Sequence, residues 1–222
     1  IRNHKEARPF VLGLPTGSSP LGVYRRLIEM NKAGKVSFKN VITFNMDEYV
    51  GLPREHDQSY WYFMHDNFFN HIDIPAENVN ILDGMAEDLE AECQRYEDKI
   101  ASYGGIGLFL GGSGVDGHIA FNEPNTPFDT LTHIAELTEE IISDNARFFA
   151  SIEELPTKAC TMGLKSIMND KKIILIATSK KKKMAVEQLI SGKINEAWPC
   201  TILRNHPDVV IYVDKEIEIA GL

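Results

Sequence analysis

The stretch at 106–124, Ile-Gly-Leu-Phe-Leu-Gly-Gly-Ser-Gly-Val-Asp-Gly-His-Ile-Ala-Phe-Asn-Glu-Pro, decides how the rest of the chain is interpreted. The apolar run 106–110 predicts a buried strand. The four glycines within 111–117 let the backbone turn sharply and leave space above the end of that strand. In an open α/β sheet, ligands bind outside the carboxyl ends of the strands, so we expect a ligand site here.

This turn also carries acid–base side chains, because Asp116, His118 and Glu123 fall within eight positions of one another. Such a trio favours proton-transfer chemistry over packing. The glycine spacing at 112–117 also matches the dinucleotide-binding fingerprint, but that fingerprint requires a helix to open there, and Pro124 follows instead. A core histidine in a tight glycine turn is the other alternative, and the flanking acids disfavour it.

Composition restricts the class of protein. The 222 residues are 43% hydrophobic, which fits one globular domain with a sizeable core. The net charge of −9 disfavours nucleic acid and anionic membranes as partners. Cys93, Cys160 and Cys200 are far apart and odd in number, which predicts free thiols and a cytoplasmic location. No apolar run approaches the length of a membrane span.

Strand and helix patterns alternate along the chain. Apolar runs predict strands at 10–14, 41–45, 79–82, 106–110, 133–137, 172–177 and 209–213, and helical spacing predicts helices after 20, at 58–69, at 87–103 and after 179. This alternation predicts an α/β fold with a parallel sheet. The aromatic-rich segment 58–69 is interpreted as a core helix. The charged segment 138–156 has weak periodicity and is interpreted as a lid over the site or a pair of surface helices.

An anion site is indicated where the first strand meets its helix. Pro-Thr-Gly-Ser-Ser-Pro at 15–20 places Pro20 in the first helical turn with Ser19 as the cap. Free backbone N–H groups at such a turn bind phosphate, although an ordinary capped helix has the same pattern. The lysines at 180–183 oppose a helix dipole; most are expected to be solvated, and one to meet an anion.

Two further acids, Asp47 and Glu48, directly follow the strand at 41–45. They lie where a site is expected at the carboxyl end of a strand. Turn acids that cap a helix are an equally good interpretation of this segment taken alone.

Four motifs together resemble the glucosamine-6-phosphate deaminase family. They are Leu-Gly-Leu-Pro-Thr-Gly-Ser-Ser-Pro at 12–20, Asn-Met-Asp-Glu-Tyr-Val-Gly-Leu at 45–52, Asp-Gly-His-Ile-Ala-Phe-Asn-Glu-Pro at 116–124 and Asn-Ala-Arg-Phe-Phe at 145–149. The resemblance covers essentially the whole chain, in order. It implies a modified Rossmann-like fold with a mainly parallel central sheet flanked by helices, a single domain over 1–222, and a lid at 138–157. It also implies that the family's first strand and helix are missing before residue 10.

The resemblance further implies that glucosamine 6-phosphate and water are converted to fructose 6-phosphate and ammonia in amino-sugar catabolism. His118 would open the sugar ring, with Asp116 and Glu123 orienting it and tuning its charge. Asp47 would move a proton from the carbon that bears the amine to the neighbouring carbon, and Glu48 would have a supporting role at most.

The resemblance assigns the substrate's phosphate to Thr16, Gly17, Ser18 and Ser19, to Lys182, and to Arg147 on the lid. It implies no metal and no organic cofactor, and it leaves the oligomeric state open. Two alternatives remain: a 6-phosphogluconolactonase-like hydrolase, which shares the phosphate turn, and a sugar-phosphate sensor that has lost catalysis.

The resemblance also bears on regulation. Leu131, His133 and Ala135 stand where allosteric members carry basic residues that bind an activating sugar phosphate. We therefore expect no such activation here.

Overall fold

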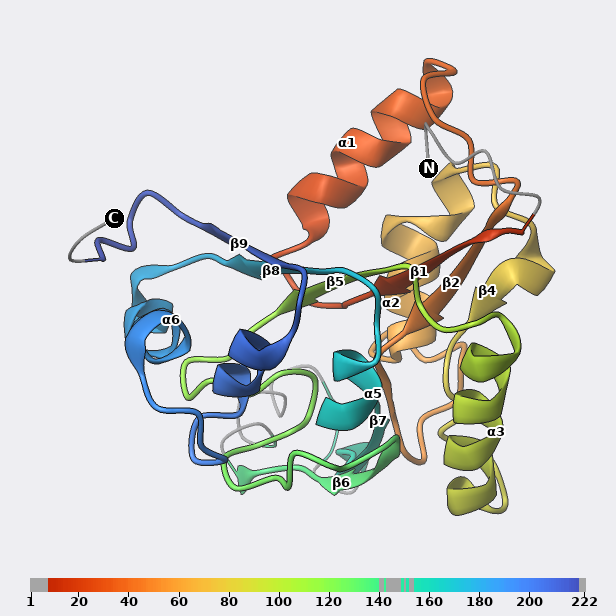
Figure 1. Ribbon diagram of the computed structural model, residues 1–222. Helices are drawn as coiled ribbons and strands as arrows, with labels where there is room; N and C mark the ends of the chain where they lie inside the picture. Colours follow the sequence, from red (N-terminus) through yellow and green to blue (C-terminus); the bar gives the residue numbers. More distant parts are fainter. Residues whose placement is uncertain (1–7, 140–141, 143–148, 150, 152–153, 220–222) are drawn as a thin grey trace.

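A computed structural model describes residues 8–139, 142, 149, 151 and 154–219. Its main sheet has six parallel strands in the order β4-β2-β1-β5-β8-β9 (Figure 1). Their bounds are β1 Phe10–Leu14, β2 Val41–Asn45, β4 Val79–Asn80, β5 Leu108–Gly112, β8 Ile173–Ala177 and β9 Val209–Val213. The expected α/β fold with a mainly parallel central sheet is confirmed.

Helices cover both faces of this sheet because its strands are apolar on both sides. Leu12 and Leu14 pack with α1 (Leu21–Lys32) and α2 (Tyr60–Asn67). Val11, on the opposite face of β1, packs with the second layer of helices. That layer comprises α3 Leu89–Ser102, α5 Leu164–Met168 and α6 Lys183–Ser191. Short 3-10 turns complete the described elements at η1 Phe69–His71, η2 Ala76–Asn78, η5 Lys180–Lys182 and η6 Pro199–Asn205.

The sheet changes its direction of growth at its centre. From β1 the chain adds β2 and then β4 on one side, and later adds β5, β8 and β9 on the other. The carboxyl ends of β1 and β5 therefore form the crevice at which open α/β sheets bind ligands. Both predicted motif segments, 15–20 and 113–118, begin at these two strand ends.

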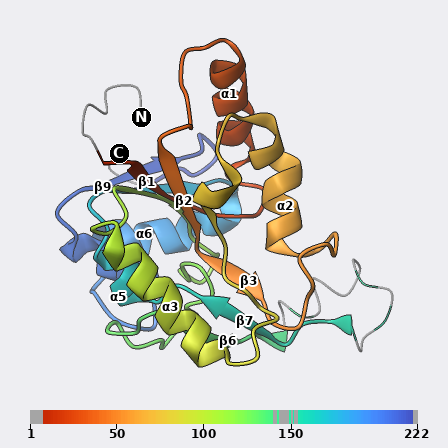
Figure 2. The same cartoon turned by 90° about the vertical axis from the view of Figure 1, so that its right-hand side faces the viewer.

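A second, smaller sheet accompanies the parallel central sheet. It is antiparallel, in the order β3-β7-β6, with β3 Asp47–Tyr49, β6 His133–Glu136 and β7 Lys158–Thr161. Figure 2 shows β3 continuing from β2 toward β7 and β6. Only Met46 separates β2 from β3, so the chain passes from one sheet into the other within one residue. β7 and α5 are elements that the sequence patterns did not predict.

Several boundaries differ from those expected. The strand placed at 106–110 is β5, and it includes Gly111 and Gly112 because they pair with β8. Ser19 does not cap α1: Pro20 occupies the cap position without a side-chain hydrogen bond. The helix expected after Ser179 begins with η5 before it continues as α6. Most of the segment 138–157 expected as a lid lies outside the described residues.

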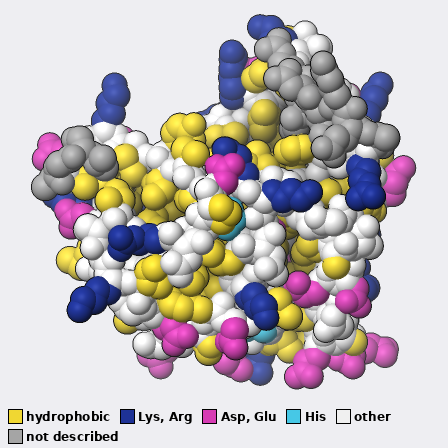
Figure 3. All heavy atoms as spheres, in the orientation of Figure 1, with side chains coloured by type: hydrophobic (Ala, Val, Ile, Leu, Met, Phe, Trp, Pro, Cys, Tyr) yellow, Lys and Arg dark blue, Asp and Glu magenta, His cyan; other side chains and the backbone are white. Residues whose placement is uncertain are grey.

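The surface carries charges of both signs. On the face seen in Figure 3, Lys and Arg side chains are interspersed with Asp and Glu side chains. Within the described ranges, no helix combines the length and apolarity that crossing a bilayer requires.

Candidate active site

A cavity of about 280 Å³ opens at the crevice between β1 and β5. Its walls come from the turn 15–20, from glycines 111, 112 and 114, and from Met46, Asp47, Tyr60, His118, Phe121 and Lys182. Thr16, Gly17, Ser18 and Ser19 all line this cavity, so seven of the predicted site residues meet in one place. Asp116 and Glu123 stand behind His118 rather than in the wall.

The turn after β1 forms one end of the cavity. Gly17 has a φ of +83°, which an L side chain rarely adopts, and this conformation makes the sharp bend possible. Buried Tyr24 on α1 donates a hydrogen bond to the Pro15 carbonyl and fixes the start of the turn. The Ser19 hydroxyl lies 3.1 Å from that of Thr178, at the end of β8, so the turn is joined to the strand that leads to the lysines.

Lys182 reaches the same end of the cavity from η5. Burial lowers the pKa of its ammonium group. Lys180 and Lys181, in the same turn, are exposed and do not line the cavity. Ser179, which caps η5, has a φ of +87° and is therefore strained. The chain thus adopts an unfavourable conformation at the residue that starts the turn bearing Lys182.

His118 also lines the cavity, beside two acids. Its Nδ1 is 2.8 Å from Asp116 Oδ1 and 3.7 Å from Glu123 Oε1. The His118 backbone N–H also donates to Asp116 Oδ1 at 3.2 Å. Gly114 makes room for the ring, because a Cβ there would stand 2.2 Å from an imidazole carbon.

The protonation of this trio follows from its contacts. Burial lowers the pKa of His118, but the hydrogen bond and charge of Asp116, together with the charge of Glu123, outweigh burial and raise it. Burial raises the pKa of Asp116, but the hydrogen bonds from His118 outweigh it and hold that pKa well below its usual range. The cluster therefore favours an imidazolium paired with a carboxylate.

The trio also has the spacing of a cation site, which the sequence analysis had not expected. Ligand atoms of Asp116, His118 and Glu123 all lie within 4.8 Å of one another. Two carboxylates and an imidazole are ligands that divalent metals accept. They are equally the groups that fix and charge a catalytic histidine.

Asp47 occupies the floor of the cavity at the start of β3. Its side chain is buried, and its Oδ1 has no hydrogen-bond partner among the described residues. Burial and, next, the negative charge of Glu48 raise the pKa of Asp47 to about 8, against the opposing charge of His118. A carboxylate held this way is a stronger base than one in water.

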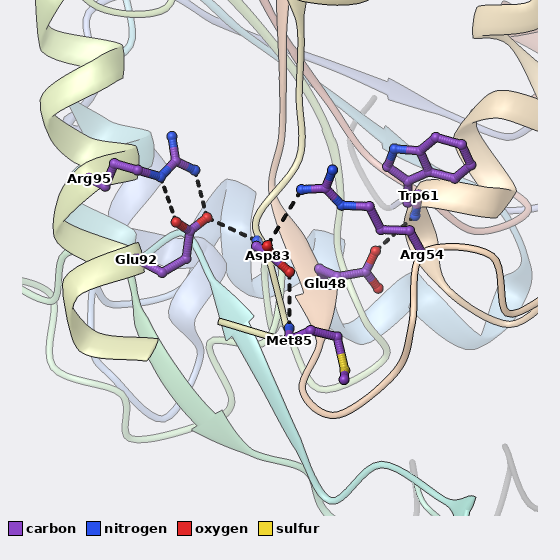
Figure 4. A network of polar contacts seen from close by, with 7 residues as sticks. All are labelled: Glu48, Arg54, Trp61, Asp83, Met85, Glu92 and Arg95. Atoms are coloured by element: carbon purple, nitrogen blue, oxygen red, sulfur yellow. Dashed lines mark hydrogen bonds and ion pairs between the residues drawn. The ribbon is translucent and has the colours of Figure 1, made fainter. Parts of the chain in front are cut away.

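Glu48 does not line the cavity and caps a helix instead. The two neighbouring acids, which the local sequence pattern alone does not distinguish, therefore have different positions. Its carboxylate accepts hydrogen bonds from the backbone N–H groups of Tyr60 and Trp61 at the start of α2. Figure 4 shows it beside Trp61 and Arg54. Burial raises the pKa of Glu48 to about 7, against those backbone hydrogen bonds and the charge of Arg54.

Sequence reasoning missed the aromatic wall of the cavity. Tyr60 and Phe121 line it with their rings parallel, 5° apart in plane and 6.3 Å between centroids. The segment 58–69 was interpreted as a core helix, and most of α2 is one, but its first residue faces the site. The only signal in the sequence was Ser59, which caps α2 through Tyr62 and so fixes where the helix begins. Arg147 lies outside the described residues.

These observations define an acid–base pocket for a small ligand at the switch point of an α/β sheet. A family model described as glucosamine-6-phosphate isomerases/6-phosphogluconolactonase matches residues 2–211. The chain therefore belongs to this family. Relatives at 51–56% identity are named glucosamine-6-phosphate deaminases.

The glucosamine-6-phosphate deaminase of Thermoanaerobacter pseudethanolicus is 56% identical over 212 residues, covering 96% of this chain and 84% of that protein. The glucosamine-6-phosphate deaminase of Dictyostelium discoideum is 53% identical and covers 97% and 80%. A solved monomeric glucosamine-6-phosphate deaminase matches with a TM-score of 0.90 at 44% identity, covering 94% of this chain and 87% of that one. The 6-phosphogluconolactonase of Thermotoga maritima shares the fold, with a TM-score of 0.73 at 21% identity and coverage of 94% and 86%.

Proposed function

We propose that this chain converts glucosamine 6-phosphate and water to fructose 6-phosphate and ammonia. The observation that carries the proposal is that three groups share one cavity. They are the buried base Asp47, the histidine His118 with two acids beside it, and the turn 15–20 with Lys182. Relatives at 51–56% identity bear the name of this activity, while the lactonase structure shares only the fold at 21% identity.

The first step is opening of the sugar ring by His118. The imidazolium donates a proton to the ring oxygen as its bond to C1 breaks. The resulting neutral imidazole then takes the proton of the C1 hydroxyl, which leaves an aldehyde and restores the starting charge. Asp116 supports both stages, because its carboxylate contacts Nδ1 and holds the ring in place.

The second step is isomerisation by Asp47. The carboxylate removes the proton from C2, and that electron pair forms the C1–C2 double bond of an enolamine. The pair of the C1 carbonyl moves to its oxygen, which takes a proton from His118 and becomes a hydroxyl. The same carboxyl group returns the proton to C1, so that C2 becomes an iminium carbon. Water then adds to C2 and one of its protons passes to the nitrogen. Ammonia leaves, and the remaining hydroxyl proton returns to His118 to give the ketone. The high pKa of Asp47 suits this role, since a stronger base takes a carbon-bound proton more readily.

The phosphate binds at the turn after β1. Thr16, Gly17, Ser18 and Ser19 surround it with hydroxyl and backbone donors, and Lys182 supplies a cation. Arg147 adds a second cation from the segment 138–157, which acts as a lid. The whole chain works as one domain on a small sugar phosphate, without a resident metal or organic cofactor.

The test is a pair of assays on the same preparation. Ammonia and fructose 6-phosphate should appear in equal amounts from glucosamine 6-phosphate, and 6-phosphogluconolactone should not be hydrolysed above its spontaneous rate. Lactone hydrolysis without ammonia release would assign the chain to the other branch of the family. Tight binding of the sugar phosphate without any turnover would make the chain a sensor.

A further inference from the structure

The N-terminus of α2 is held by a side chain from another element. Glu48, on β3, accepts the Tyr60 N–H at 2.9 Å with one oxygen and the Trp61 N–H at 2.8 Å with the other. The first oxygen also accepts the Tyr49 N–H at 2.9 Å. Ser59 accepts the next N–H, that of Tyr62, at 3.0 Å. The first three backbone donors of α2 are thereby satisfied, two of them by a residue adjacent to the base Asp47.

Fixing this helix end also fixes one wall of the cavity. Tyr60 is the first residue of α2, and its ring packs beside those of Tyr49 and Phe121, with its hydroxyl 3.1 Å from that of Tyr49. A shift of the helix end would carry this ring with it. Since Glu48 is 2% exposed and reaches α2 with both oxygens, the carboxylate connects the base and the wall as one rigid unit.

A supporting network surrounds this carboxylate on the side away from the cavity (Figure 4). Arg54 lies beside Glu48 and is held by Asp83 at 3.6 Å. The Asp83 N–H donates to Glu92 at 2.9 Å, and Glu92 is paired through both oxygens with Arg95. Asp83, Glu92 and Arg95 thus hold the Arg54 guanidinium next to the buried carboxylate.

We infer that Glu48 is a positioning residue for the proposed reaction: it sets the place of Tyr60 against the substrate and keeps a negative charge beside the base Asp47. The inference rests on the proposed deaminase function. Glu48 does not touch the cavity, so it acts on the reaction only through Asp47 and α2. The titratable and charged groups that face it are Asp47 and Tyr49 on its own strand, Cys160 opposite on β7, Tyr60 on α2, and Arg54; His118 faces Asp47.

The test compares Glu48→Gln with Asp88→Asn. Asp88 caps α3 by accepting the Ala91 N–H, so its variant makes the same carboxylate-to-amide change at a helix end outside the cavity. We expect Glu48→Gln to lower kcat/KM by about 10- to 100-fold, mainly in kcat, because displacement of a positioned group by a fraction of an ångström is costly. Asp88→Asn should leave kcat/KM within about twofold, since surface changes away from such features have small effects.

The pH profile separates positioning from stability. Loss of the Glu48 charge removes one cause of the high pKa of Asp47, so the acid limb of kcat/KM should move to lower pH in Glu48→Gln. Glu48→Asp keeps the charge, so its limb should stay in place while kcat falls. Glu48→Asp also carries the test if Glu48→Gln does not fold.

A lower Tm in Glu48→Gln with wild-type kcat and an unmoved acid limb would show a purely structural role and overturn the inference. So would Glu48→Asp with wild-type kcat. If the wild-type chain releases no ammonia, the proposed function fails separately, and the placement of α2 is then measured by Trp61 fluorescence. A spectrum changed in Glu48→Gln and not in Asp88→Asn would support the placement; unchanged spectra in both would reject it.

Discussion

Asp47 and Asp116 carry the same chemical group in two regions of one site, and their surroundings shift the pKa values of the two carboxyl groups in opposite directions. Asp47 is 5% exposed on the floor of the cavity, where burial and then the charge of Glu48 raise its pKa to about 8. Asp116 is in a partly exposed loop, where hydrogen bonds from His118 outweigh burial and hold its pKa well below the usual range. One carboxyl group is therefore made a strong base, and the other a permanent anion.

The difference shows how one site can handle two kinds of proton. A carbon-bound proton needs a strong base, and the floor provides it. Protons on oxygen need a group that both donates and accepts near neutral pH, and a histidine steadied by a fixed anion provides it. When environments push the pKa values of neighbouring groups apart, their acid and base roles can be assigned.

Removal of the base should have the largest effect. Asp47→Asn keeps the shape of the floor but cannot accept a proton, so we expect kcat to fall by at least about a hundred- to ten-thousandfold. Binding of fructose 6-phosphate should change little, because the phosphate turn is untouched. Ammonia release and calorimetric binding of the product are the two measurements. Turnover within a few-fold of wild type would remove Asp47 from the mechanism.

Replacement of the histidine should have the next largest effect and depend on the substrate. In His118→Gln we expect a loss of about a hundredfold or more on the cyclic sugar, the usual contribution of a general acid or base. An open-chain substrate mimic should lose much less, because ring opening is no longer needed. Equal losses on both substrates would contradict the assignment and leave His118 as a support for the loop.

The fixed anion should affect the pH profile more than the maximal rate. Asp116 raises the pKa of His118 through a hydrogen bond and its charge, whereas burial alone lowers it. In Asp116→Asn the imidazolium should therefore lose its proton at lower pH, and the alkaline limb of kcat/KM should move down in pH. The acid limb, which belongs to Asp47, should move up in pH, because the opposing charge of His118 is lost earlier in this variant. A profile with both limbs unchanged would show that Asp116 does not control His118.

The phosphate end should respond mainly in substrate binding. Lys182→Ala removes the cation that lines the cavity, and we expect KM to rise about 10- to 100-fold, since a hydrogen bond between charged groups contributes roughly 1.5–3 kcal/mol. Lys180→Ala and Lys181→Ala serve as matched controls and should be nearly neutral. Equal effects of all three would mean that the lysines act as a diffuse field.

The sequence predicted best what depends on local pattern. The strands at 10–14, 41–45 and 209–213 were found at those bounds, because each is a continuous apolar run of the parallel sheet. The resemblance to the family picks Lys182 from the lysines at 180–183. Asp47 and His118 are predicted as site residues because each follows a strand end, and parallel strands end at one edge of the sheet. Their shared cavity follows from that rule.

What the sequence did not predict depends on pairing between distant segments. β3 is three residues long and becomes a strand only by pairing with β7, where Asp47 faces Thr161. That partner lies more than a hundred residues along the chain, and no local pattern encodes it. The sequence pattern likewise predicts Tyr60 as a core residue. Its place in the cavity wall depends on Glu48, a residue of another element that binds the N-terminus of α2.

A second cavity extends the comparison to regulation, where we expect no effect. It measures about 340 Å³ and lies between α3 and the start of β6, lined by Leu131 and His133 together with Glu90 and Glu97. A phosphate dianion needs fixed cations to offset its desolvation, and this cavity presents carboxylates instead. An effector shifts an equilibrium only through its different affinities for the two states, so a cavity that repels the ligand cannot shift it.

The rate plotted against the concentration of glucosamine 6-phosphate should be hyperbolic and unchanged by N-acetylglucosamine 6-phosphate. A sigmoidal curve that this ligand makes hyperbolic would require a basic site elsewhere in the chain.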